Sequence, residues 1–342
     1  MKKIGILTGG ADCPGLNSVI RAVVRKSVAE GYVVSGIKNG WDGLVTNDMR
    51  VLDLRATSGI LDRGGTILGT SRMLPPIEEG MMDKIAENFK RSGMDAVIAV
   101  GGEDTLKIAL DLYEQKDIPI VGVPKSIDNA LSGTDYAFGF DTAVNVATEC
   151  IDRLHTTAES HHRIIVIEVM GRHTGWIALQ AGIAGGADFI LIPEYPVDMN
   201  ELCDSLSARH KRGKTFSIIV VSEGTQIVGH EMPIAALDRR ATRSRFAKIG
   251  EVMANLIEEK TNYETRVSVL GHIQRGGTPS AYDRVIGTRF GIKAVELIQN
   301  NEFGKMASLN GSKMTSVNIS DAVKEYKKID EALYEIAQVF SA

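Results

Sequence analysis

The stretch that decides the fold is "DAVIAVGGEDT", residues 95–105. An unbroken apolar run leads into two glycines, and Glu103 and Asp104 follow them directly. Strands that are apolar throughout, without alternation, belong to parallel sheets that are covered on both faces. In such sheets ligands bind beyond the carboxyl ends of the strands. The stretch therefore predicts a buried strand followed by part of a binding site.

The same pattern recurs along most of the chain. Further apolar runs bounded by glycine, proline or polar residues are "IGILTGG" (4–10), "YVVSGI" (32–37), "IPIVGVP" (118–124), "RIIVIEVMG" (163–171), "DFILIPE" (188–194), "FSIIVVSEG" (216–224) and "RVSVLGH" (266–272). Segments long enough for helices separate them, so we predict a doubly wound α/β fold with right-handed crossovers. A long helical pattern at residues 138–163 precedes a fresh series of strands, and we expect the chain to cross between domains there.

Composition limits the class of protein. The chain has 342 residues, 44% of them hydrophobic and 24% charged, with 35 glycines, which is typical of a two-domain α/β enzyme. Its net charge is −4 and it has no block of Lys and Arg, so we expect no nucleic-acid partner. Its three cysteines form no CxxC pair, which argues against a zinc site or a disulfide framework. The apolar run at the N-terminus is too short for a signal peptide or a membrane span, so we expect a cytoplasmic protein without a membrane partner.

Glycines mark the first strand end. "TGGADCPG" (8–15) places Gly9, Gly10 and Gly15 in a turn that opens a helix, where free amide groups favour an anion. It matches neither the P-loop nor the complete dinucleotide fingerprint. Glycine in such a turn is as often a steric requirement as a ligand cradle, and the turn alone leaves both interpretations open.

Acidic and basic side chains mark the next two strand ends. Glu103 and Asp104 could hold Mg²⁺ together with phosphate oxygens, although an acidic pair is more often solvated surface. In "PKSIDNA" (124–130), Asp128 could accept a proton from a sugar hydroxyl and Lys125 could pair with a phosphoryl oxygen. These groups and "MGRHTG" (170–175) should converge on one cleft, and together they predict phosphoryl transfer.

The second half of the chain carries cationic side chains near strand ends. They are Arg163, Arg172, Arg266, His272 and Arg275. A single arginine of this kind is usually part of a surface ion pair. The five together, in a protein of slight negative charge, suggest capture of a phosphorylated substrate.

In combination these motifs resemble the phosphofructokinase family over residues 1–300. The resemblance rests on "GILTGGADCPGLN", "GGTILGTSR", "GGEDT", "PKSIDN", "MGR", "SEG" and "GHIQRGG". It implies two doubly wound, mostly parallel-sheet α/β domains with the active site in the cleft between them. We expect residues 1–140 plus about 256–306 to bind the phosphoryl donor, and residues 141–255 plus about 307–342 to bind fructose 6-phosphate.

The resemblance also implies roles for single residues. The donor would contact Gly10, Ala11, Arg72, Gly102, Asp104, Thr105 and Lys125, and Glu103 would associate with Mg²⁺. Catalysis would depend on Asp128 as the base that deprotonates the 1-hydroxyl, with Ser126, Arg72, Lys125 and Arg172. The sugar phosphate would contact Ser126, Asp128, Arg163, Met170, Gly171, Arg172, Glu223, Arg266, His272 and Arg275. Arg266 and Arg275 with His272 match a clamp for the 6-phosphate. Arg163 matches an arginine that reaches it from a neighbouring subunit, so the resemblance implies a homodimer or homotetramer.

The donor predicted from the resemblance is pyrophosphate. Family members that use ATP typically carry glycine at the position of Asp104, and a carboxylate there would crowd and repel the α-phosphate of a nucleotide. Lys125 would supply charge for the shorter donor, although it also occurs in some ATP users. The prediction is a diphosphate–fructose-6-phosphate 1-phosphotransferase of glycolysis and gluconeogenesis. One alternative is an ATP-dependent 6-phosphofructokinase. The other is a catalytically weakened regulatory paralogue, which is kept because Ala11 and Ala130 replace a glycine and an aspartate usual in the family.

Overall fold

The computed structural model describes residues 2–230 and 249–339, and the chain divides into two compact units. Unit 1 comprises Met1–Ile127, Leu131–Thr142 and Arg275–Lys327, and unit 2 comprises Asp128–Ala130, Ala143–Gln274 and Lys328–Ala342. Relative to the predicted domains, residues 128–130 and 256–274 lie in unit 2, and residues 141–142 and 307–327 lie in unit 1. Two parts of the predicted sugar-phosphate domain, 231–248 and 340–342, lie outside the described residues.

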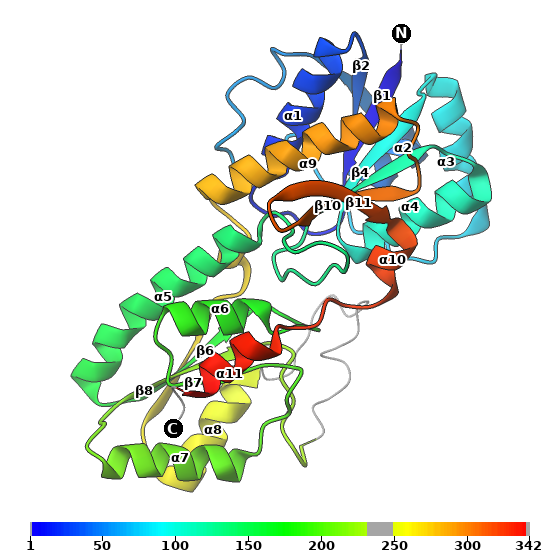
Figure 1. The fold of residues 1–342 in the computed structure, drawn as a ribbon. Coiled ribbons are helices and arrows are strands. Elements are labelled where there is room, and N and C mark those ends of the chain that lie inside the picture. Colours follow the sequence, from blue (N-terminus) through cyan, green and yellow to red (C-terminus); the bar gives the residue numbers. More distant parts are fainter. Residues whose placement is uncertain (1, 231–248, 340–342) are drawn as a thin grey trace. The chain divides into compact units, whose positions relative to one another are not determined.

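Unit 1 is built on a seven-stranded sheet with the strand order β11-β10-β5-β4-β1-β2-β3 (Figure 1). Its strands are β1 (Lys3–Thr8), β2 (Val33–Ile37), β3 (Met49–Leu52), β4 (Ala96–Gly101), β5 (Ile120–Pro124), β10 (Lys305–Asn310) and β11 (Lys313–Asn318). The inner strands are parallel, and the edge strands β3 and β11 are antiparallel to their neighbours. The apolar runs predict β1, β2, β4 and β5 correctly, whereas β3, β10 and β11 lack such a run and were not predicted.

Helices cover both faces of this sheet. They are α1 (Leu16–Ala29), α2 (Trp41–Thr46), α3 (Glu79–Ser92), α4 (Glu103–Lys116), α9 (Ala281–Gln299) and α10 (Ile319–Lys324). α1 and α9 lie side by side (Figure 1), and Val19, Ile20 and Val23 of α1 are fully buried. A buried hydrophobic cluster joins Trp41, Ile85 and Leu106 of α2, α3 and α4 to the sheet.

Unit 2 contains a four-stranded parallel sheet with the order β7-β8-β6-β9. Its strands are β6 (Ile164–Val169), β7 (Phe189–Leu191), β8 (Ser217–Ser222) and β9 (Thr265–Val269). Its helices are α5 (Phe140–His161), which begins in unit 1, α6 (Trp176–Ala184), α7 (Met199–Lys211), α8 (Ile249–Thr261), the 3-10 helix η2 (Gly271–Gln274) and α11 (Glu331–Val339). Because all four strands run in one direction, their carboxyl ends share one edge of the sheet and their amino ends share the other.

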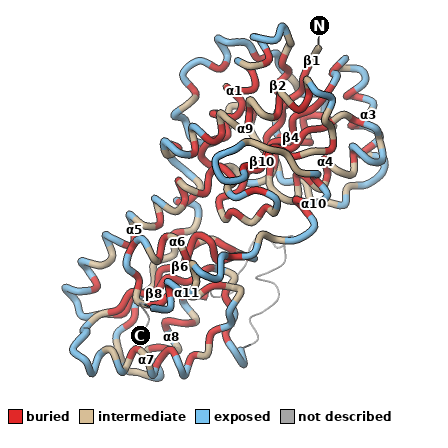
Figure 2. Tube along the Cα trace, in the orientation of Figure 1, coloured by how far each residue is buried: buried red, intermediate tan, exposed pale blue. Residues whose placement is uncertain are grey.

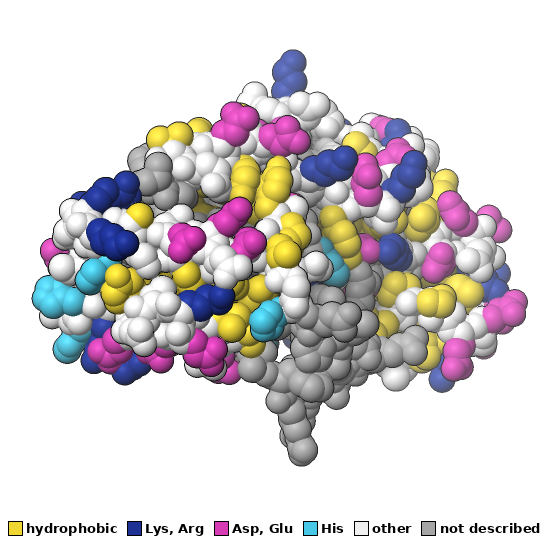
Figure 3. Space-filling model, turned by 90° about the horizontal axis from the view of Figure 1, so that it is seen from below, with side chains coloured by type: hydrophobic (Ala, Val, Ile, Leu, Met, Phe, Trp, Pro, Cys, Tyr) yellow, Lys and Arg dark blue, Asp and Glu magenta, His cyan; other side chains and the backbone are white. Residues whose placement is uncertain are grey.

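Burial follows these layers. The strands of both sheets are mostly buried and the outer faces of the helices are exposed (Figure 2). The α/β class with mostly parallel sheets is thus confirmed for each unit. Within the described ranges no helix combines the length and the apolar character that a membrane span needs. Basic and acidic side chains are interspersed over the face seen in Figure 3.

Candidate active site

The loop after β1 packs tightly against the start of α4. A Cβ atom added to Gly9 would lie 2.6 Å from Oγ1 of Thr105, and one added to Gly101 would lie 2.3 Å from Cβ of Thr105. Thr105 is only 3% exposed, so it fills the space between the ends of β1 and β4. Glycine at these two positions is therefore a packing requirement, and it brings the loop of residues 9–12 against the first turn of α4.

A second segment holds the same loop from the other side. The Gly10 amide donates to the Ser71 carbonyl at 3.0 Å, and Oγ1 of Thr70 donates to the Gly10 carbonyl at 2.6 Å. These reciprocal bonds fix the position of the backbone next to Arg72. Arg72 itself is exposed, and it forms no hydrogen bond or ion pair with any residue in the described ranges.

Lys125 reaches the loop from the end of β5. Lys125 is 6% exposed, and its main-chain amide donates to the Gly101 carbonyl at 3.1 Å. Its ammonium group donates to the Ala11 carbonyl. Ala11 has an exposed side chain and does not have a positive φ, so its methyl group causes no backbone strain. The positive charge of Lys125 is therefore placed at the loop after β1, which the family resemblance predicts to contact the phosphoryl donor.

The acidic pair lies in the first turn of α4, whose N-cap is Gly102. Acidic side chains are favourable there because the helix dipole is positive at its N-terminus. Glu103 also forms an ion pair with Lys107. Across the described residues, no group of three or more His, Cys, Asp or Glu side chains could hold a metal ion by itself. Mg²⁺ is commonly held by one or two carboxylates together with substrate phosphates, and the pair fits that kind of site.

The expected base, Asp128, lies in a tight turn of the chain. Asn129 has φ of 50° and is 1% exposed, a left-handed conformation that Asn tolerates better than most residues. The Asp128 side chain is half-buried, and its carbonyl accepts a hydrogen bond from Oγ1 of Thr174 at 3.1 Å. Ser126, two residues earlier, is buried. Within unit 2 the structure therefore brings Asp128 against the loop of residues 170–175, which follows β6.

That loop is fixed by hydrogen bonds to Ser222 and Gln274. Oγ of Ser222 donates to the Gly171 carbonyl at 2.6 Å, and the Met170 amide donates to Oε1 of Gln274 at 3.3 Å. Gly171 has φ of 139°, and a Cβ atom there would lie 2.3 Å from Oγ of Ser222. Met170, Gly171, Arg172, Glu223 and His272 all follow carboxyl ends of strands in this one sheet. This edge of the sheet, the carboxyl edge, is therefore where the predicted sugar-binding residues of unit 2 gather.

Several residues that hold this loop were not found from the sequence. Both carboxylate oxygens of Glu194, which follows β7, accept from the Gly175 amide, at 3.0 and 3.1 Å. Burial raises the pKa of Glu194, and its hydrogen bond from Gly175 partly opposes that rise. Thr174 and Gln274 are also buried and also act on main-chain groups. Thr174 lies in "MGRHTG" and Gln274 lies in "GHIQRGG", but neither motif assigns them a role, because any polar side chain of suitable length could hold a main-chain group.

Two predicted site residues lie at the amino edge of the sheet instead. Arg163 directly precedes β6, and Arg266 near the start of β9 pairs with Ile165. Glu264 joins the two arginines, with a 2.8 Å ion pair to Arg163 and a short one to Arg266. The hydrogen bond from Arg163 is the main cause that lowers the pKa of Glu264. Within unit 2 the structure thus groups Arg266 with Arg163 and not with His272.

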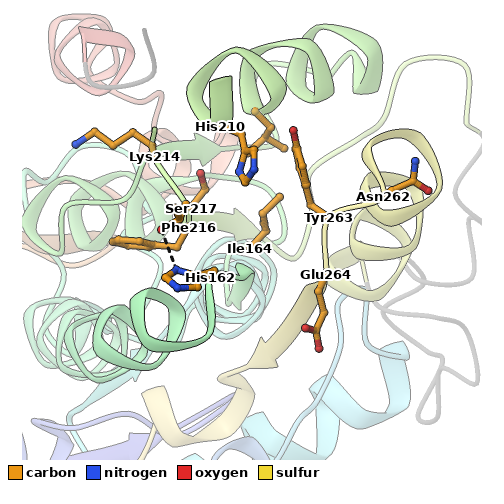
Figure 4. A pocket seen from close by; sticks show the side chains of 11 residues that line it. His162, Ile164, His210, Lys214, Phe216, Ser217, Asn262, Tyr263 and Glu264 are labelled. Carbon is orange, nitrogen blue, oxygen red and sulfur yellow. Dashed lines mark hydrogen bonds between the residues drawn. The ribbon is translucent and has the colours of Figure 1, made fainter. Parts of the chain in front are cut away.

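A small pocket of about 130 Å³ lies at this amino edge (Figure 4). Its lining includes His162, His210, Lys214, Tyr263 and Glu264. Figure 4 shows that the Glu264 side chain points away from His210 and Tyr263. Its carboxylate therefore serves the arginines rather than the imidazole of His210.

Arg275, the third member of the predicted clamp, belongs to unit 1. Burial raises the pKa of the Cys13 thiol, and the charges of Lys125 and Arg275 oppose that rise. Cys13 lies in the loop after β1, so Arg275 adds positive charge near the predicted donor loop.

Comparison with known proteins decides the family. The profile of the family described as phosphofructokinase matches residues 3–298. The chain is 51% identical over 341 residues to a pyrophosphate–fructose 6-phosphate 1-phosphotransferase of Streptomyces coelicolor, covering 99% of both chains. The chain belongs to the phosphofructokinase family. It is also 48% identical over 338 residues to an ATP-dependent 6-phosphofructokinase of the same organism, covering 98% of this chain and 99% of that one.

Solved structures agree with this assignment. The Saccharomyces cerevisiae phosphofructokinase structure matches with a TM-score of 0.82 and 31% identity, covering 100% of this chain. The chain spans 48% of that longer polypeptide. A pyrophosphate-dependent phosphofructokinase from Nitrosospira multiformis shares the fold, with a TM-score of 0.84 at 21% identity over 96% of this chain and 86% of that one. The resemblance inferred from the motifs is therefore confirmed for the family.

Proposed function

We propose that this phosphofructokinase uses pyrophosphate, transferring a phosphoryl group from MgPPi to the 1-hydroxyl of fructose 6-phosphate. The products are fructose 1,6-bisphosphate and phosphate, and the reaction is reversible and serves glycolysis and gluconeogenesis in the cytoplasm. The observation that carries the proposal is the donor loop. There the Lys125 ammonium binds the Ala11 carbonyl, and Asp104 lies one residue before Thr105, which packs against the same loop.

Charge at this loop favours the shorter donor. The Asp104 carboxylate would repel the α-phosphate of a nucleotide, whereas pyrophosphate has no third phosphate and no nucleoside. Lys125 and Arg72 supply positive charge at the loop, which suits the oxygens of pyrophosphate. Repulsion and attraction of this kind select between two donors without any difference in fold.

The chemistry follows from the groups at hand. Asp128 takes the proton of the 1-hydroxyl as the oxygen forms a bond to the terminal phosphorus of pyrophosphate. The bond from that phosphorus to the bridging oxygen breaks, and phosphate leaves. Lys125 and Arg72 stabilise the charge on the transferring group, and the Ser126 hydroxyl can hydrogen-bond it. Mg²⁺, held by Glu103 together with pyrophosphate oxygens, would neutralise phosphate charge when bound.

The sugar phosphate would be held mainly by the carboxyl edge of unit 2. Met170, Gly171, Arg172 and Glu223 would contact the sugar, and His272 with Arg275 would contact the 6-phosphate. Arg163 and Arg266 share Glu264 at the opposite edge of the same sheet. A strand rises about 3.3 Å per residue, so residues at opposite ends of β6 cannot serve one phosphate within unit 2. We therefore infer that both arginines act in the site of another copy, in a homodimer or homotetramer.

ATP dependence is the second candidate. It is favoured by the ATP-dependent relative from Streptomyces coelicolor, whose 48% identity is close to the 51% of the pyrophosphate-named relative. Overall similarity therefore does not discriminate between the donors, and the choice depends on the residues of the donor loop.

A coupled assay tests the proposal. Purified protein, Mg²⁺ and fructose 6-phosphate are supplied with either pyrophosphate or ATP, and formation of fructose 1,6-bisphosphate is followed. Turnover with pyrophosphate and much weaker turnover with ATP supports the proposal. Preference for ATP overturns the donor assignment. Binding of fructose 6-phosphate without turnover of either donor would indicate a weakened regulatory paralogue.

A further inference from the structure

Thr174 joins two parts of the proposed site through one hydrogen bond. It lies in the loop between β6 and α6, its side chain is 2% exposed, and its Oγ1 donates to the Asp128 carbonyl at 3.1 Å. Residues Met170 to Arg172 of the same loop are the expected sugar contacts. Thr174 therefore connects the sugar-binding loop to the backbone of the expected base.

The loop can act as a rigid support because it is held on both sides of Thr174. Ser222 donates to the Gly171 carbonyl on one side, and Glu194 accepts from the Gly175 amide on the other. Ser222 is the last residue of β8 and Glu194 follows β7, so the loop is attached to the sheet itself. A hydroxyl on such a support holds its acceptor in a defined place.

The acceptor is well placed to control the direction of the Asp128 side chain. The Asp128 carbonyl belongs to the peptide plane between Asp128 and Asn129. Rotation of that plane changes ψ of Asp128 and φ of Asn129 together, and Asn129 holds the uncommon φ of 50°. A hydrogen bond to this carbonyl stabilises that conformation against rotation to a commoner one.

We propose that Thr174 is a positioning residue for catalysis, which fixes the turn at Asp128 so that the carboxylate meets the 1-hydroxyl of the bound sugar phosphate. The inference rests on the proposed function, and it gives a role to Thr174, which lies in "MGRHTG" but has no role in the sequence-based predictions. Small errors in the placement of a reacting group can cost up to about 10²-fold in rate. Loss of one hydrogen bond should displace the turn only in part, so we expect about a tenfold fall in kcat.

The test compares Thr174→Val and Thr174→Ser with Thr225→Val. Thr225 offers a matched control because it is 3% exposed, lies in the same unit and donates its Oγ1 to a different main-chain acceptor, the Leu191 carbonyl, at 3.2 Å. With pyrophosphate as donor, Thr174→Val should lose about tenfold in kcat while KM for fructose 6-phosphate changes little. Thr174→Ser should keep most of the wild-type kcat. Thr225→Val should have a lower melting temperature but an unchanged kcat.

Two further measurements separate positioning from general damage. Thr174→Val in an Asp128→Asn background should cause no additional loss of kcat, because the group that Thr174 positions is already absent. Amide hydrogen exchange at residues 127–130 should be several-fold faster in Thr174→Val than in Thr225→Val.

The inference is overturned if Thr174→Val and Thr225→Val have equal kcat, if the loss appears in KM instead, or if exchange at the turn is unchanged. It is also overturned if the serine variant, which keeps the hydroxyl, is no better than the valine variant. A wild-type protein inactive with every donor overturns the proposed function separately, and the exchange measurement then still decides whether Thr174 holds the turn.

Discussion

The donor loop of unit 1 and the sugar loop of unit 2 are built by the same means but with different groups. Each follows a buried parallel strand, and each has loop carbonyls bound by side chains from neighbouring segments. In the donor loop, residues 9–12, one of these side chains is the charged Lys125, with the neutral Thr70 beside it. In the sugar loop, residues 170–175, the Ser222 hydroxyl donates to the Gly171 carbonyl. The hydroxyl of Thr174, a residue of the loop itself, donates to the Asp128 carbonyl outside the loop.

The two loops therefore differ in whether a residue that supports the loop can also bind the ligand. Where the supporting group is also a cation, one residue both shapes the loop and offers charge to the ligand. In the sugar loop the hydroxyls of Ser222 and Thr174 are neutral and buried, so they shape the site and leave the chemistry to other residues. Mutations in the donor loop should therefore alter structure and donor binding together, whereas mutations in the sugar loop should separate them.

The largest effect is expected at Asp128. Asp128→Asn keeps the shape of the side chain and removes the proton acceptor, so kcat should fall by about 10² or more while binding of fructose 6-phosphate is retained. Initial rates and a binding isotherm for the sugar phosphate measure the two quantities. The exposed Asp152 of α5 provides the control Asp152→Asn. Nearly normal turnover in Asp128→Asn would remove Asp128 as the base.

A smaller loss of activity is expected at Lys125, where a charged and a neutral support of the donor loop can be compared directly. Lys125→Met removes both the bond to the Ala11 carbonyl and the charge, and kcat/KM for pyrophosphate should fall by about 10- to 100-fold. Thr70→Val removes only the neutral bond to the Gly10 carbonyl and should cost less. Steady-state kinetics with varied pyrophosphate measures both. Equal losses in the two variants would show that the charge of Lys125 adds nothing beyond loop shape.

A change in preference, rather than a large loss, is expected at Asp104. Asp104→Gly removes the carboxylate that repels the α-phosphate of a nucleotide, so the ratio of kcat/KM for ATP to that for pyrophosphate should rise several-fold. The neighbouring Glu103→Gln serves as a comparison, since it should weaken both donors alike. An unchanged ratio in Asp104→Gly would place donor selection elsewhere in the chain.

The smallest effect is expected at Glu194, the ionisable support of the sugar loop. Burial raises its pKa in the folded protein, so at pH values just above the ordinary carboxyl pKa the folded state binds more protons than the unfolded state. Stability should therefore decrease as pH rises through this window. Glu194→Gln should remove that decrease, because an amide oxygen can still accept from the Gly175 amide.

Melting temperatures measured across the weakly acidic range test this expectation. The exposed Glu201 of α7 provides the control Glu201→Gln, which should follow the wild type. If the melting temperature of Glu194→Gln depends on pH in the same way as that of the wild type, the pKa of Glu194 is not raised in the folded protein.

Much of the fold could be predicted because its strands are apolar throughout. Runs such as "AVIAV" before "GGEDT" report burial on both faces, and the polar residues that follow them report a strand end. Strands β10 and β11 could not be found in this way. β11 is an edge strand of partly exposed residues, "KMTSVN", and its pairing with β10 is decided by tertiary contacts.

The residues of the candidate site, too, could be predicted from the sequence only in part. Motifs mark side chains whose chemistry is specific, such as Asp128 and Lys125. Thr174, Gln274 and Glu194 hold main-chain groups of the sugar loop, and this task requires only a polar atom in the right place. The family resemblance groups Arg266 with His272 and Arg275 in one phosphate clamp. The parallel pairing of β6 with β9 places it at the opposite edge of the sheet, beside Arg163.

The reverse reaction tests the central claim most directly. Purified protein with Mg²⁺ and fructose 1,6-bisphosphate is given either inorganic phosphate or ADP, and formation of fructose 6-phosphate is followed. Because the pyrophosphate-dependent reaction lies near equilibrium, the enzyme should form fructose 6-phosphate and pyrophosphate when phosphate is present. The rate should saturate as the phosphate concentration rises. Formation of fructose 6-phosphate with ADP and not with phosphate would contradict the claim that pyrophosphate is the donor.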